Sequence, residues 1–236
     1  MNFIKLILVF SLCGLTSCST IFKTILGLKN PKVLEKEEIL SELNSTFSKD
    51  TTARVVDYRY IKMTDSADQA RMIISSLSFN EPMFNSQGQR WCYTGNRCKL
   101  CSFDEFDSIV KDNYKVLKLC GENYLRKVDS TEYFKITKLE KLTQKIQFIY
   151  PNQSLPKANL YAIFYWSEFT QSKKKKRERF DIFISKIKQI DTNFCILRIN
   201  SDFTSDYYEK RRAKFRIEKE GKTASLIIDN LPKVLR

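Results

Sequence analysis

The sequence predicts an α/β fold whose C-terminal half is built on two buried parallel strands joined by a helix. Two apolar runs of strand length, Leu160–Trp166 and residues 194–199, have the continuous hydrophobicity of strands that are covered on both faces. Between them, apolar residues recur at helical spacing and predict one buried helix face: Phe180, Phe183, Ile184, Ile187 and Ile190. A strand, a helix and a strand in this order favour a parallel, right-handed unit.

A hairpin is expected to follow this unit. Residues 214–219 and Thr223–Asp229 flank Glu220-Gly221, and both runs are rich in residues that suit strands. A short helix is expected near Tyr207, in the loop before the hairpin.

The N-terminal half predicts a mixture of helices and strands. We expect helices over 35–43 and 65–77, a strand over 53–61, a hairpin of 83–84 with 90–93, a helix beginning at Ser102 and a largely helical linker over 125–148. The segment 151–156, with a proline at each end, is the best candidate for a boundary. We therefore expect an α+β region over 33–150, carrying a cysteine cluster, and a C-terminal region over 151–236.

The composition excludes many enzyme mechanisms. The chain has 236 residues, a formal net charge of +14, seven cysteines and no histidine. Catalysis by a Ser-His-Asp or Cys-His pair and metal binding by imidazole are therefore impossible. With 42% hydrophobic residues and only six glycines, the chain has the composition of a folded globular protein.

The N-terminus has the pattern of an export signal. Residues 1–17 combine Lys5 with an apolar stretch that is too short to cross a bilayer. The following Leu15-Thr16-Ser17-Cys18 resembles the bacterial lipobox, which implies that Cys18 is lipidated and that 18–32 form a tether. Because Ser19 is not aspartate and no acidic cluster follows, the resemblance implies the outer membrane, on its periplasmic face. A plain signal peptide is the alternative.

The order of elements in the C-terminal half resembles the thioredoxin fold. That family places a W-C-x-x-C motif after the first strand, where this chain has Trp166-Ser167-Glu168-Phe169-Thr170. The resemblance implies that Ser167 and Thr170 occupy the positions of the redox cysteines, and that Ala213 occupies the position of the family's cis-proline. Hydroxyl groups cannot form a disulfide, so the usual active site would be inactive.

The whole chain also resembles a group of small lipoproteins from Bacteroidota. The residues that carry this resemblance are the lipobox, the mid-chain hairpin and the segment Ile25-Leu26-Gly27-Leu28-Lys29-Asn30-Pro31. The group shares a thioredoxin-like half that often lacks redox cysteines, and it implies no known activity.

Four cysteines form a cluster with three possible interpretations. Cys92, Cys98, Cys101 and Cys120 follow the spacing C-x5-C-x2-C-x18-C. In an oxidising compartment the preferred interpretation is structural disulfides, whose pairing the sequence leaves open. A zinc site and a redox-active Cys98/Cys101 pair, activated by Lys99 and a helix N-terminus, are the alternatives. Cys195, within a predicted strand, is expected to be a core residue.

A basic run opens the helix after Trp166. Residues 173–179 (KKKKRER) would normally be a solvated helix face, but they are unfavourable for the helix dipole. Contact with lipid headgroups is the functional interpretation, since an exported protein seldom meets nucleic acid. The candidate binding surface comprises Trp166, Ser167, Phe169, Thr170, Lys173, Lys174, Lys175, Lys176 and Arg177.

Together these observations predict a non-enzymatic lipoprotein. We expect it to bind the membrane through its anchor and to bind an envelope protein or peptide, with no nucleic acid, metal or cofactor. The alternative is a thiol–disulfide oxidoreductase that uses Cys98 and Cys101.

Overall fold

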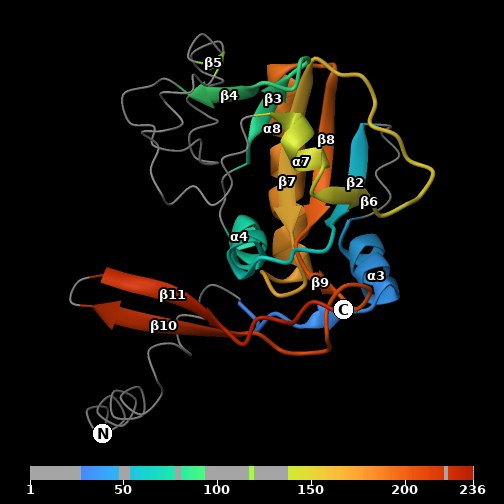
Figure 1. Cartoon of the computed structure of the whole chain (residues 1–236). Helices are drawn as coiled ribbons and strands as arrows, with labels where there is room; N and C mark the ends of the chain where they lie inside the picture. Colours follow the sequence, from blue (N-terminus) through green and yellow to red (C-terminus); the bar gives the residue numbers. More distant parts are fainter. Residues whose placement is uncertain are drawn as a thin grey trace, which may run out of the picture.

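A seven-stranded mixed sheet forms the centre of the computed structural model (Figure 1), which describes residues 28–47, 54–77, 81–93, 117–119, 138–220 and 223–235. The strand order is β5-β4-β3-β7-β8-β2-β6, with β7, β8 and β2 parallel and the others antiparallel to their neighbours. The sheet strands are β2 (Val55–Tyr60), β3 (Met83–Asn85), β4 (Arg90–Tyr93), β5 (Leu117–Leu119), β6 (Ile146–Phe148), β7 (Leu160–Trp166) and β8 (Phe194–Asn200).

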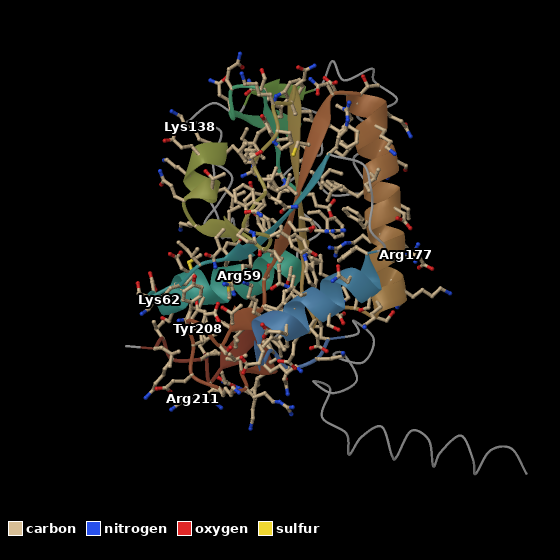
Figure 2. All side chains as sticks on the ribbon, turned by 90° about the vertical axis from the view of Figure 1, so that its right-hand side faces the viewer. Arg59, Lys62, Lys138, Arg177, Tyr208 and Arg211 are labelled. Atoms are coloured by element: carbon tan, nitrogen blue, oxygen red, sulfur yellow. The ribbon has the colours of Figure 1, made fainter. Side chains whose placement is uncertain are left out.

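Helices cover both faces of this sheet. In Figure 2, α8 (Lys173–Ile190) lies on one side of the sheet, and α4 (Ser66–Leu77) and α7 (Leu139–Thr143) lie on the other. α3 (Lys36–Thr46) packs beside α8 and starts with a capping box, in which the Glu35 backbone N–H donates to the Glu38 side chain at 2.8 Å.

Successive side chains of the central strands point to opposite faces of the sheet, and this divides the interior into two hydrophobic cores. On β7, Tyr161, Ile163 and Tyr165 pack in the core that contains residues of α4 and α7. Phe164 and Trp166 pack in the core that contains residues of α3 and α8. Both faces of β7 and β8 are buried, and this explains why β7 is apolar throughout. β8 is apolar except for Arg198 and Asn200, which are also buried.

The expected elements of the C-terminal half are confirmed. β7, α8 and β8 form the predicted strand, helix and strand, and β7 and β8 are parallel over their whole length. The predicted hairpin forms as β10 (Lys214–Glu220) and β11 (Thr223–Asp229), but it makes its own two-stranded sheet. It projects from the lower end of the molecule in Figure 1.

In the N-terminal half, most of the expected elements also form. The helices over 35–43 and 65–77, the strand over 53–61 and the hairpin of 83–84 with 90–93 correspond to α3, α4, β2 and β3–β4. The helix expected at Ser102 lies outside the described residues. The part of the linker that is described contains α7, as expected, but also a strand, β6, that was not expected.

Two further details differ from expectation. Tyr207 lies in a turn after β9 (Phe203–Thr204) rather than in a short helix, since β9 pairs with β1 (Val33–Leu34) and constrains the chain there. The large sheet also contains strands of both predicted regions, 33–150 and 151–236. Along the chain, β6 precedes the segment 151–156 and β7 follows it. Within the described residues, no helix is long and apolar enough to cross a membrane.

Candidate functional site

The turn after β7 is inside the protein. Trp166, Ser167 and Phe169 are fully buried, and Thr170 is 3% exposed. These four side chains therefore cannot form the exposed binding surface that the sequence suggested. The physical reason is that the turn lies between the two cores, where α4, α8 and the base of the hairpin cover it.

Ser167 and Thr170 are partners in a hydrogen-bond network. The Ser167 hydroxyl lies 3.0 Å from the Thr170 hydroxyl and 3.2 Å from the Ser76 hydroxyl of α4. The Thr170 hydroxyl also lies 3.3 Å from the Ser167 carbonyl oxygen. Because α8 begins only at Lys173, this pair precedes the helix and does not lie in its first turn. The network connects α4 to the turn.

A buried carboxyl group holds the other side of the same turn. Asp202, just after β8, accepts hydrogen bonds from the Glu168 backbone N–H at 2.8 Å and from the Asn200 side chain at 2.7 Å. Burial raises the pKa of Asp202 to about 7, although both hydrogen bonds oppose that increase. Asp202 therefore titrates near neutral pH while it fixes the backbone of Glu168.

The basic run on α8 is divided by the fold. Lys173, Lys174, Lys175 and Arg177 are exposed, but Lys176 is 1% exposed and contacts the Glu42 carboxylate of α3 at 2.7 Å. Its ammonium also donates to the Ser167 carbonyl oxygen at 3.0 Å. Lys176 is thus a structural residue, and its place in the predicted surface was wrong.

Glu42 compensates for the cations at the start of α8. It also pairs with Lys173 at 3.1 Å. Burial raises the pKa of Glu42 and is the largest single influence, but the bonds to Lys176 and Lys173 together lower it below its usual value. The first turn of α8 has no acidic residue of its own, so α3 supplies the negative charge that a helix N-terminus prefers.

A pocket lies where the turn after β7 meets the segment around residues 29–32 and the loop before β10. It has a volume of about 310 Å³ and is lined by Lys29, Asn30, Lys32, Glu168 and Arg212. We call it the basic pocket, because three cations line it against one carboxylate. It is at the carboxyl end of β7, where ligands bind in open sheets with parallel strands.

The segments that form the basic pocket are bonded to one another. The Lys29 backbone N–H donates to the Phe169 carbonyl oxygen at 2.8 Å, and Lys32 forms an antiparallel bridge with Arg212. The Asn30 side-chain oxygen accepts from the Phe215 N–H at 3.2 Å. Sequence reasoning missed this pocket because it brings together three separate parts of the chain: residues 29–32, Glu168 and Arg212.

The cysteines do not add a site within the described residues. Cys195 is fully buried with a free thiol, and burial raises its pKa to about 12, so it is a poor nucleophile, as expected of a core residue. Cys92 lies in β4, while Cys18, Cys98, Cys101 and Cys120 lie outside the described residues. No cluster of metal ligands occurs in the part of the chain that the structure describes.

The remaining buried charges have a structural role. Arg198 of β8 binds Asp57 of β2 through two hydrogen bonds of 2.6 and 3.0 Å, and its guanidinium lies 4.4 Å from the centre of the Phe47 ring. The two strands are in register at this pair. Since α3 and α8 cover it, the pair is enclosed and offers no contact to a ligand.

Comparisons of the chain with protein-family models, with curated proteins and with solved structures found no match. The functional argument therefore rests on the geometry of this chain.

Proposed function

We propose that this protein is a membrane-anchored lipoprotein of the bacterial outer membrane, on its periplasmic face, which acts as a non-catalytic binding protein with a thioredoxin-like C-terminal half. The support for the anchor is the lipobox that ends at Cys18. The Lys29 backbone, eleven positions later, is hydrogen-bonded to the Phe169 carbonyl oxygen of the domain. An extended chain of that length reaches about 35 Å, so the domain would stay close to the bilayer.

The observation that carries the non-catalytic part of the proposal is the buried pair of hydroxyls. Ser167 and Thr170, which the proposed resemblance aligns with the two thiols of the thioredoxin family, have their hydroxyls 3.0 Å apart. Neither hydroxyl can transfer electrons, and both are occupied by hydrogen bonds inside the protein. Selection for redox chemistry would not produce this environment.

The thioredoxin-like part of the proposal is supported by the parallel strands β7 and β8 joined by α8, with the antiparallel strand β3 on the other side of β7. The hairpin that borders β7 precedes it in the chain, whereas β10–β11 form a separate sheet. The thioredoxin-like arrangement that we propose therefore combines β7, α8 and β8 of the C-terminal half with β3 of the N-terminal half, and it does not follow the order of elements in thioredoxin.

Membrane fractionation tests the anchor. The full chain is expressed in a bacterium that processes lipoproteins, and the Cys18→Ala variant is compared with it. We expect the full chain in the outer-membrane fraction and the variant in a soluble or unprocessed form. Globomycin should also block processing of the full chain. Equal fractionation of both chains would overturn the anchor.

Insulin reduction tests the absence of catalysis. We expect the purified chain to be inactive and the Cys98/Cys101 couple, if it forms a disulfide, to have a potential below about −300 mV, as structural bridges do. Activity that is lost in a Cys98→Ser/Cys101→Ser variant, with a potential between about −120 and −270 mV, would establish the oxidoreductase instead.

A further inference from the structure

The basic pocket has an excess of positive charge that the domain does not neutralise. Lys29 pairs with Glu168 at 2.7 Å, and Lys32 lies 3.6 Å from Glu38 outside the pocket lining. Arg212 is exposed, and it forms no salt bridge within the described residues. The Arg212 guanidinium therefore has donors available for an anion.

The donors in this pocket suit a phosphate group. A guanidinium offers a planar pair of N–H donors that matches two phosphate oxygens, and lysine ammonium groups add point charges. The pocket volume of about 310 Å³ is large enough for a phosphate with its attached ester group. The one carboxylate in the lining, Glu168, would repel such an anion unless Lys29 continued to neutralise it.

The position of the pocket in the chain indicates where the anion comes from. Lys29, Asn30 and Lys32 are at the end of the segment 18–32 that we expected to be a tether, but in the structure Lys29 and Lys32 are bonded to the domain. The hydrogen bond from Lys29 to Phe169 fixes that segment to the domain, so the tether would approach the domain beside the pocket. Figure 2 shows Arg211, the neighbour of Arg212, at the lower end of the molecule. A tether of about 35 Å would keep this end near the headgroups.

We propose that the basic pocket binds the phosphate group of an anionic phospholipid headgroup in the membrane that anchors the chain. The inference rests on the proposed anchor at Cys18. Binding of one headgroup, together with the lipid chains on Cys18, attaches the domain to the membrane at two points. The domain then has a fixed orientation, with the carboxyl ends of β7 and β8 towards the bilayer and the opposite end of the sheet towards the periplasm.

Vesicle flotation of the full chain tests this proposal. The Cys18→Ala background removes the anchor, so that binding reports on the headgroup alone, and vesicles of phosphatidylcholine with and without phosphatidylglycerol are compared. We expect binding only where phosphatidylglycerol is present. The Lys32→Gln/Arg212→Gln variant should weaken the Kd about thirtyfold, since each cation near a membrane surface contributes about 1 kcal/mol.

Two matched variants separate a pocket from general attraction by charge. Lys157→Gln/Lys188→Gln removes two exposed cations at the opposite end of the sheet and should change the Kd less than threefold. Glu168→Gln removes the carboxylate of the lining and should strengthen binding. Equal losses in the two double variants, or weaker binding by Glu168→Gln, would overturn the proposal.

Inorganic phosphate distinguishes the lipid from a soluble anion. Calorimetric binding of inorganic phosphate to the chain as tight as its binding to vesicles would identify a site for a soluble anion and overturn the lipid source. Unchanged thermal unfolding of each variant confirms that it is folded. The two proposals can fail separately. If the chain is anchored through Cys18 but the pocket variants bind vesicles normally, only the pocket proposal is refuted. If the full chain and Cys18→Ala fractionate equally, the proposed function is refuted.

Discussion

The protein has two concentrations of positive charge, and they differ in how they arise. The run at the start of α8 is continuous in sequence, but in the structure its charges point in different directions. Lys176 is enclosed against Glu42, while Lys174 and Arg177 lie near acidic residues one turn later, Glu178 and Asp181. Figure 2 shows Arg177 on α8, far from Arg211. The basic pocket, in contrast, combines Lys29 and Lys32 of one short segment with Arg212 from a distant part of the chain.

This difference shows that charge density along a sequence is a poor guide to a binding site. Residues adjacent on a helix turn by about 100° each, so consecutive lysines cannot all face one ligand. Cations brought together by different segments can converge, because tertiary hydrogen bonds hold each segment in place. Lys176 of the run is therefore structural and its exposed cations do not converge, whereas the pocket is the better candidate for recognition.

The largest expected effect comes from the buried member of the run. Lys176→Ala removes a buried partner of Glu42 and should lower the free energy of unfolding by about 3 kcal/mol. Urea unfolding followed by the fluorescence of buried Trp166 measures it. The matched variant Lys175→Ala, which removes the exposed neighbour, should change the stability by less than about 0.5 kcal/mol. Equal losses would contradict the division of the run into buried and exposed charges.

The second effect concerns Asp202, which holds the backbone of Glu168 beside the pocket. Because its pKa of about 7 in the folded protein lies above its value in the unfolded chain, the folded state binds more protons between about pH 4 and 7. This group therefore makes the protein less stable as pH rises through that range. Glu81, whose pKa burial raises to about 8, acts in the same direction.

The Asp202→Asn variant isolates this contribution. We expect a flatter dependence of the free energy of unfolding on pH between about 4 and 7, measured by urea unfolding at several pH values. Asp181→Asn, at an exposed position of α8, should leave the slope unchanged. A slope in Asp202→Asn as steep as that of the unmodified chain would show that the Asp202 carboxyl group is not protonated in the folded protein.

A smaller effect on stability is expected at Ser172, the residue that directly precedes α8. The Ser172 side chain accepts a hydrogen bond from the Lys175 backbone N–H at 3.4 Å. Ser172→Ala should lower the free energy of unfolding by about 1 kcal/mol, because cations in the first turn make the helix N-terminus depend on its cap. Ser185→Ala, in the middle of α8, is the matched control. A loss confined to Ser185→Ala would contradict this view of the helix start.

The smallest effect on stability is expected in the pocket. Arg212→Ala should change the free energy of unfolding by less than about 0.5 kcal/mol, because its side chain is exposed and supports no packing. The same variant should weaken binding to phosphatidylglycerol vesicles. If instead it destabilises the protein as strongly as Lys176→Ala, Arg212 has a structural role and the contrast between the two basic regions fails.

Much of the fold follows from local patterns. β7, α8 and β8 are at the positions that apolar runs and helical spacing predict. A strand buried on both faces has a run of apolar residues, and a helix buried on one face has apolar residues at helical spacing. β6 was missed because a strand of three residues, paired at the sheet edge, has too few positions for a pattern to develop. The separate sheet of β10 and β11 was missed because a hairpin has the same local sequence whether or not it joins a larger sheet.

The candidate site was predicted only in part. The sequence located the turn after Trp166 and its two hydroxyl residues, but treated them as exposed. Aromatic residues beside a basic run are equally compatible with a groove and with a core. The packing of α4 and α8 over the turn decides between them, and that packing depends on residues more than 80 positions away, such as Ser76.

The sequence by itself determined the absence of histidine chemistry and the pattern of two strands joined by a helix, and it predicts the lipid anchor at Cys18. These properties depend on residue identity or on short-range periodicity, so they are present before the chain folds. Only the tertiary structure decided that Trp166 and Lys176 are enclosed and that Lys29, Lys32 and Arg212 line one pocket. The reason is that burial and convergence depend on contacts between distant segments, and no local pattern encodes which segments will meet.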